Sequence, residues 1–240
     1  MAQALSEWGM AGIEALHAHV AVLVIVDVLS FSTSVDIAVS RGAIVYPFPF
    51  ADRGAAERAA AHAGALLAHP RSASGGPFSL SPTSLANIPH GTKLMLPSPN
   101  GSRLSFAASR MPRPIPVLTG CLRNAASVAR AARALAGDRP IGVIPAGESW
   151  PDGTLRPAIE DLLGAGAILN QIACPCSPEA QVARDAYRAA QHELPSLIRR
   201  SVSGRELIDR GFPADVDLAL EQNASTSAPM LIDSAYRAAL

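Results

Sequence analysis

Continuous apolar stretches alternate along the chain with stretches whose apolar residues recur at helical spacing. The apolar stretch at 20–29 is β-branched, as in a strand that is buried on both faces of a parallel sheet. Further strands are predicted at 43–47, 65–68, 93–96, 116–118 and 141–144. Helices are predicted at 32–41, 52–63, 102–110, 122–136, 158–172, 179–192 and 203–210. This alternation predicts a single α/β domain over 1–240, with a mainly parallel sheet flanked by helices in three layers.

Local signals refine this pattern at three places. Residues 69–90 are rich in Ser, Pro and Gly and predict a long irregular loop, of the kind that often carries function. The Ser32-Thr-Ser run is expected to cap the helix that follows it. Ser203 and Glu206 have the spacing of a capping box, and the last sixty residues are expected to pack as helices.

Charge is distributed unevenly along a chain whose formal net charge is zero. Residues 58–137 hold nine basic and no acidic residues, or +9, whereas residues 1–57 hold six acids against two bases, or −4. Residues 138–240 hold fourteen acids against nine bases, or −5. The pattern predicts an anion site from the middle of the chain and a cation site from its flanks. A chance distribution of solvated arginines is the alternative.

Composition narrows the class of protein without naming a function. A hydrophobic content of 49% with 17% charged residues argues against general disorder, and neutrality argues against a nucleic-acid partner. The longest apolar run, 20–26, ends at Asp27 and is too short to span a membrane, and no signal peptide is recognised. The three cysteines Cys121, Cys174 and Cys176 form no disulfide framework, which favours a reduced, cytoplasmic protein. Many small apolar side chains leave room for a homodimer interface.

Polar residues follow several predicted strands, where ligands bind in open parallel sheets. Asp27 ends the first apolar run, and a carboxylate there is costly unless it holds a metal or accepts hydrogen bonds. Glu160 and Asp161 begin a later helix, and with Asp27 they would form an oxygen cage for Mg²⁺. Helix capping by Asp27 and dipole compensation by Glu160 and Asp161 are the alternatives.

Two other loops carry groups suited to an anion. Asn100, Gly101 and Ser102 join a strand to a helix, so free amides there suit phosphate, although Asn-Gly turns are also common. Arg123 and Asn124 begin another helix, where an Arg can clamp phosphate or sulfonate with two donors. A surface arginine is the alternative for Arg123.

Six segments, in chain order, carry a resemblance to a known family. They are Val24-Ile-Val-Asp27-Val-Leu29 with Ser32-Thr-Ser; Arg41-Gly-Ala43; Asn100-Gly-Ser-Arg103; Gly120-Cys-Leu-Arg-Asn124-Ala125; Ala146-Gly147 with Ile159-Glu160-Asp161 and Gly164-Ala-Gly166-Ala; and Ser203-Gly-Arg-Glu-Leu207 with Gly211 and Asp215. Over about residues 20–220 these segments resemble the motifs of the 2-phosphosulfolactate phosphatase family. Two departures stand out: Ser30 replaces an Arg that is usual in the family, and the loop 69–83 keeps Arg71 but lacks the usual Glu and Asp.

The resemblance implies a Mg²⁺-dependent phosphatase that hydrolyses 2-phospho-3-sulfolactate to sulfolactate and phosphate, a reaction on the route to coenzyme M. From their positions at predicted strand ends and helix starts, we expect Asp27 with Glu160 or Asp161 to hold the metal, Asn100–Ser102 to bind the phosphate, and Arg71 and Arg123 to bind phosphate, carboxylate or sulfonate. The two departures leave two alternatives, a phosphatase of a different 2-phospho acid and a non-catalytic anion-binding homologue.

Overall fold

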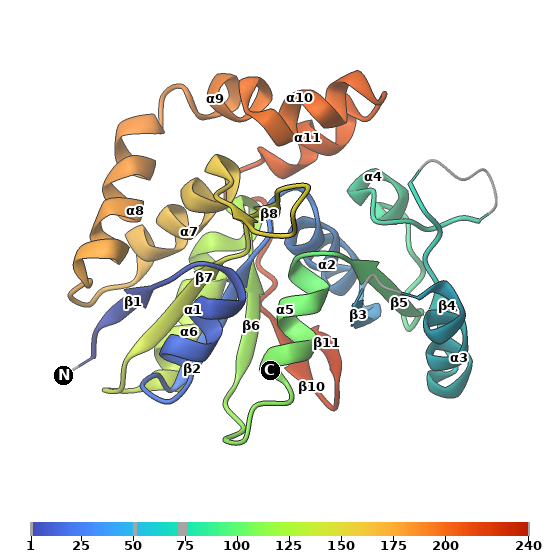
Figure 1. Ribbon diagram of the computed structural model, residues 1–240, viewed down its shortest axis with the longest axis horizontal. Coiled ribbons are helices and arrows are strands. Elements are labelled where there is room, and N and C mark those ends of the chain that lie inside the picture. Colours follow the sequence, from blue (N-terminus) through green and yellow to red (C-terminus); the bar gives the residue numbers. More distant parts are fainter. Residues whose placement is uncertain (1, 50–51, 72–75, 240) are drawn as a thin grey trace.

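The computed structural model describes residues 2–49, 52–71 and 76–239 of the chain (Figure 1). The elements are β1 (Ala4–Ser6), α1 (Gly9–Leu16), β2 (Val22–Val26), α2 (Phe31–Ser40), β3 (Ile44–Pro49), α3 (Arg53–Ala63), β4 (Leu66–Leu67), α4 (Pro82–Leu85), β5 (Lys93–Ser98), α5 (Gly101–Ala108), β6 (Val117–Gly120), the 3-10 turn Leu122–Asn124, α6 (Ala125–Ala136), β7 (Ile141–Pro145), β8 (Glu148–Ser149), β9 (Leu155–Arg156), α7 (Ile159–Gln171), α8 (Pro178–Ala190), α9 (Leu194–Arg200), α10 (Val202–Asp209), α11 (Pro213–Ala219), β10 (Pro229–Ile232) and β11 (Ala235–Ala238).

The main sheet consists of two parallel blocks joined by a hairpin. Its strand order is β1-β7-β2-β6-β10-β11-β3-β5-β4. The first four strands pair in parallel, as do the last three, whereas β10 and β11 are antiparallel to each other and to their neighbours. The predicted α/β fold with a mainly parallel sheet is therefore confirmed.

Strand β2 is apolar throughout because helices cover both of its faces. Val22, Val24 and Val26 belong to the core shared with α6 and α7, and Leu23 and Ile25 to the core shared with α1 and α5. All five side chains are fully buried. Each such burial contributes about 1.5–3 kcal/mol, so this strand fixes the place of the residue that follows it, Asp27.

The C-terminal part of the chain is not entirely helical, and here the prediction was wrong. Helices α8 to α11 follow one another as expected, and Figure 1 shows α9, α10 and α11 lying beyond one end of the strands. Residues 229–238, however, return to the sheet as the β10–β11 hairpin. Asp233 and Ser234 make its two-residue turn at φ 48° and 65°, a left-handed conformation that suits the twist of a hairpin.

Both predicted helix caps were also wrong. The hydroxyls of Ser32 and Thr33 lie inside α2, where that of Ser32 pairs with Thr119 Oγ1 at 2.7 Å and Thr33 donates to the carbonyl of Val28. Helix α10 is capped by Ser201, whose hydroxyl accepts from the amide of Gly204.

The loop predicted at 69–90 contains a short helix, α4, and its positions 72–75 lie outside the described residues. Within the ranges that the structure covers, no helix is both long and apolar enough to cross a membrane.

Candidate active site

A cleft of about 470 Å³ opens where residues that follow the strands meet the loop around Arg71 and helix α10. Its polar and charged lining comes from both parallel blocks and from the helical region. These residues are Asp27, Ser30, Asp52, Arg53, His69, Arg71, Ser98, Asn100, Glu148, Ser203, Glu206 and Arg210. The cleft thus joins Arg71, from the basic middle of the chain, to Asp27 and Glu148, from its acidic flanks.

Asp27 is held by two backbone amides. Its Oδ1 accepts from the amide of Phe31 at 3.1 Å and its Oδ2 from the amide of Gly101 at 2.7 Å. The side chain is 4% exposed. Burial raises the pKa of Asp27 to about 6, and the nearby charge of Glu160 adds to the rise, whereas both amides and Arg71 oppose it. The two amides therefore hold the carboxylate in place. A cation that reaches it would favour its ionised form.

Glu148 is a second acid on the cleft wall, beside Asn100. The side-chain amide of Asn100 donates to Glu148 Oε2 at 2.8 Å. Burial raises the pKa of Glu148 to about 7, and the charge of Asp27 contributes to the rise. This influence indicates that the two carboxylates lie near each other.

Asp161 and Glu160 are buried and are not among the residues that line the cleft. Both oxygens of Asp161 accept hydrogen bonds, Oδ1 from the amide of Val28 at 2.7 Å and Oδ2 from that of Gly147 at 2.9 Å. Asp161 therefore ties the end of β2 to the end of β7. Burial, followed by the charges of Asp27 and Glu160, raises the pKa of Asp161. Glu160 is 2% exposed.

A magnesium ion fits the donors of this cleft, although no ready-made cage is present. Among the described residues, no three His, Cys, Asp or Glu side chains are grouped as a metal site. Asp27 and Glu148 nevertheless both line the cleft. Mg²⁺ is usually held by one or two carboxylates together with water and substrate phosphate. These two acids supply that number of ligands, whereas Asp161 is not among the residues that line the cleft.

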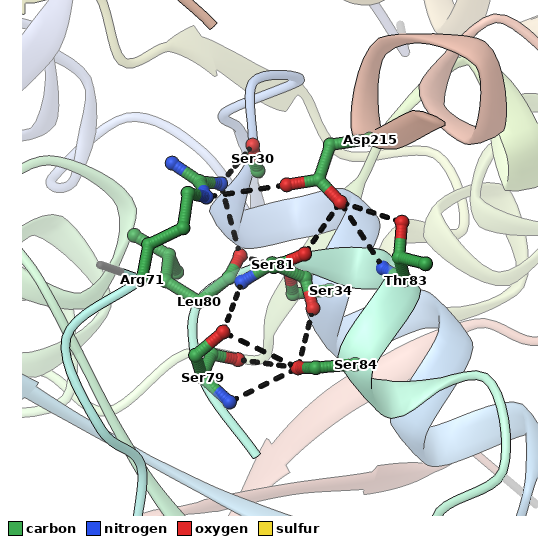
Figure 2. Close-up of polar contacts among 9 residues, drawn as sticks. All are labelled: Ser30, Ser34, Arg71, Ser79, Leu80, Ser81, Thr83, Ser84 and Asp215. Atoms are coloured by element: carbon green, nitrogen blue, oxygen red, sulfur yellow. Dashed lines mark hydrogen bonds and ion pairs between the residues drawn. The ribbon is translucent and has the colours of Figure 1, made fainter. Parts of the chain in front are cut away.

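Arg71 also lines the cleft, and Figure 2 shows its polar contacts. Its Nη2 donates to Ser30 Oγ at 2.8 Å and to the carbonyl of Leu80 at 3.2 Å, and its Nε lies 3.2 Å from Asp215 Oδ2. The Arg71 side chain is 11% exposed. A guanidinium that is fixed in this way presents a directed positive charge to a ligand.

The segment 100–102, which was predicted to bind phosphate, uses some of its donors for hydrogen bonds within the protein. The amide of Gly101 is directed at Asp27. Ser102 is fully buried, and its hydroxyl donates to the carbonyl of Leu96 at 2.6 Å. Of these three residues, Asn100 lines the cleft.

Arg123 and Asn124 are placed outside the residues that line the cleft. Arg123 Nε pairs with Asp36 Oδ2 at 3.0 Å, and Nη1 pairs with Glu221 and the carbonyl of Leu218. Asn124 is fully buried, and its Oδ1 accepts from the amide of Cys121. The expectation that Arg123 would meet Asp27 in one pocket is therefore not met.

Sequence reasoning did not propose several residues that the structure brings to this region. Glu148 was not proposed as a site residue, and Ser203 and Arg210 line the cleft from a segment that was expected only to pack as a helix. Asp215 holds Arg71 although 144 positions separate them, so no local pattern could have linked them. The motif that ends in Asp215 was the one available signal.

Comparison with known proteins gives two findings. A family model described as 2-phosphosulpholactate phosphatase matches residues 12–234. A protein named 2-phosphosulfolactate phosphatase from Methanothermobacter thermautotrophicus is 31% identical over 153 residues. That alignment covers 64% of this chain and 62% of the relative, so the chain matches less than two thirds of the relative's length.

Proposed function

Because the chain belongs to the 2-phosphosulpholactate phosphatase family, we propose that it is a phosphoric monoester hydrolase. Its proposed substrate is 2-phospho-3-sulfolactate, and its products are sulfolactate and phosphate. The observation that supports this most is the meeting of two carboxylates, Asp27 and Glu148, with the guanidinium of Arg71 in one cleft. A substrate with phosphate, carboxylate and sulfonate needs both a cation-binding and an anion-binding side.

Asp27 and Glu148 would hold Mg²⁺, and the charge of Glu160 acts on both of them. When bound, the ion neutralises charge on the phosphoryl oxygens and favours cleavage of the ester bond. Asn100 orients Glu148 through its 2.8 Å hydrogen bond. Arg71 would bind the carboxylate or sulfonate of the substrate, which helps to orient the ester so that its phosphate meets the acids.

Phosphate release from 2-phospho-3-sulfolactate, measured with and without Mg²⁺, tests this proposal. We expect turnover that requires the ion and that Asp27→Asn reduces by at least a hundredfold, on the order of 3 kcal/mol. Asp209→Asn, an exposed acid at the end of α10, is the matched control and should leave turnover unchanged. The absence of phosphate release by the wild-type protein with Mg²⁺ present would refute the proposal.

A related substrate is the second candidate, because one departure from the family pattern lies at the cleft. Ser30, which replaces the usual Arg, lines the cleft and accepts a 2.8 Å hydrogen bond from Arg71. The pocket is therefore altered beside the arginine proposed to bind the substrate. A panel of 2-phospho acids with and without a sulfonate separates the candidates, since a strong requirement for sulfonate excludes the second.

Other expectations stay predictions. A non-catalytic anion-binding homologue would bind sulfolactate without hydrolysing any ester of the panel. The homodimer and the cytoplasmic location await measurement by light scattering and by cell fractionation.

A further inference from the structure

The carboxylate of Asp215, at the start of α11, collects donors from two separate parts of the loop around the cleft (Figure 2). Its Oδ2 lies 3.2 Å from Nε of Arg71. Its Oδ1 accepts from the hydroxyl of Ser81 at 2.5 Å and from the hydroxyl of Thr83 at 2.7 Å. Asp215 is 1% exposed. One buried carboxylate thus anchors the described residues on both sides of positions 72–75.

The guanidinium of Arg71 is restrained on several sides. The ring of Phe212, also near the start of α11, lies under it with the Arg71 Cζ 5.4 Å from the ring centroid. Ser30 and the Leu80 carbonyl accept from Nη2. Among the residues that the structure describes, none accepts from Nη1, and Arg71 lines the cleft. The arrangement leaves one edge of the guanidinium for a ligand.

Electrostatics explains why a carboxylate is needed behind this arginine. Burial lowers the pKa of Arg71, and the nearby positive charge of Arg210 lowers it further, whereas the negative charge of Asp215 acts in the opposite direction. Two arginines that line one cleft repel each other. A buried counter-ion on the side away from the cleft offsets this repulsion without occupying the ligand's place.

From these contacts we infer that Asp215 is a positioning residue, which holds the Arg71 guanidinium so that its free edge binds a carboxylate or sulfonate of the substrate. The inference rests on the proposed function for the identity of the substrate. The central claim is that Asp215 is coupled to anion binding by Arg71. This coupling can be measured by ligand binding alone, without following turnover.

A double-mutant cycle tests the inference with calorimetry. The dissociation constant of sulfolactate is measured for the wild type, Asp215→Asn, Arg71→Gln and the double variant, and thermal unfolding of each confirms folding. We expect Asp215→Asn to weaken binding at least fivefold in the wild-type background and less than twofold in the Arg71→Gln background. A merely structural role would instead weaken binding by equal factors in both backgrounds, which would overturn the inference, as would unchanged binding in Asp215→Asn.

Kinetics and two further variants complete the test. Asp215→Asn should raise KM for 2-phospho-3-sulfolactate at least fivefold with little change in kcat, because Arg71 is proposed to bind the carboxylate or sulfonate and not the phosphoryl group that reacts. Asp217→Asn, an exposed acid on the same helix that pairs with Arg199, is the matched control and should change neither constant. If Asp215→Asn does not fold, Asp215→Glu keeps the charge but alters its reach, and unchanged sulfolactate binding by it would count against positioning. If the wild type binds sulfolactate but releases no phosphate, the proposed function fails while the cycle still decides the role of Asp215.

Discussion

The carboxylate of Asp27 accepts hydrogen bonds from the first residues of two helices, Phe31 of α2 and Gly101 of α5. The first amides of a helix have no partner within it, and the positive end of the helix dipole lies there. Asp27 satisfies one such amide on each helix. Asp27, which is proposed to bind the metal, therefore also connects the starts of helices α2 and α5.

Gly101→Ala should directly disturb this connection between α2 and α5. A Cβ at Gly101 would lie 2.3 Å from Cδ1 of Phe31 and 2.8 Å from Oδ2 of Asp27, so one of them must move. We expect a loss of about 1–3 kcal/mol in the free energy of unfolding and a large fall in phosphate release. Gly54→Ala, at the start of α3, is the control, because the nearest atom to its Cβ is the flexible Arg58 terminus at 3.3 Å. Equal stability of both variants would contradict the packing argument.

Stability should fall as pH rises through the acidic range in metal-free buffer. The pKa of Asp27 is about 6 in the folded protein against 3.8 in the unfolded chain, so the folded state binds the proton more tightly. The free energy of unfolding therefore decreases between about pH 4 and 6, by roughly 3 kcal/mol for this group. Urea unfolding at a series of pH values should show a smaller decrease for Asp27→Asn. Because burial raises the pKa of Glu148 to about 7, its titration should continue the decrease in the free energy of unfolding up to about pH 7. Asp209→Asn, the control, should show the same pH dependence as the wild type.

Magnesium should stabilise the protein through the same acids. At pH 7 these carboxylates repel one another, and an ion bound only by the folded state adds about 2.7 kcal/mol when it is present at about a hundred times its Kd. Thermal unfolding with EDTA and then with MgCl₂ should show a higher midpoint with the ion. The shift should be lost in Asp27→Asn and reduced in Glu148→Gln. The same shift in all three proteins would place the ion elsewhere.

Arg123→Ala should affect stability far more than catalysis. Asp36 is fully buried, and its Oδ2 pairs with Arg123 at 3.0 Å, so the substitution leaves a buried charge with Ser225 as its remaining strong donor. Breaking a buried pair in this way costs about 3–5 kcal/mol, whereas Arg199→Ala, which breaks an exposed pair, should cost about 1 kcal/mol or less. Urea unfolding measures both. A rise in KM without loss of stability would contradict this structural role and would indicate that Arg123 binds the substrate.

Cys121 should be inert toward thiol reagents in the native protein. Its side chain is fully buried, and burial raises the pKa of the thiol to about 12, so almost no thiolate is present near neutral pH. Alkylation with iodoacetamide at pH 8, followed by mass spectrometry, should label Cys174 and Cys176, which are partly exposed. Rapid labelling of Cys121 under these conditions would show that the region opens.

Much of the parallel sheet could be predicted from the sequence, because its strands are visible as local apolar runs. A continuous β-branched run bounded by an acid identified both β2 and Asp27, since helices on both faces require apolar residues at every position. Similar runs predicted most strands and helices between β2 and α8, whereas β1, α1, α4 and the β10–β11 hairpin were missed. Helix α3 was predicted to within a residue because Asp52 begins it and Gly64, at φ 60°, ends it.

The partners of the candidate residues could not be predicted, because they come from distant parts of the chain. Arg123 looked like a ligand of phosphate until the structure placed Asp36 and Glu221 against it. Asp161 looked like a metal ligand, but it is not among the residues that line the cleft and instead joins the ends of β2 and β7 through two backbone amides. A charged residue at a helix start has the same local signature whether it binds a ligand or another segment, so only tertiary structure separates the two.

The β10–β11 hairpin has a consequence for how this protein folds. Met230 pairs with Leu118 on one side and Tyr236 with Val45 on the other, so the last strands join two blocks whose other residues precede them in the chain. Until the hairpin is in place, β6 and β3 each have an unpaired edge of the kind that aggregates. The complete sheet can therefore form only after residues 229–238 have been synthesised, and β6 and β3 keep these edges exposed until then.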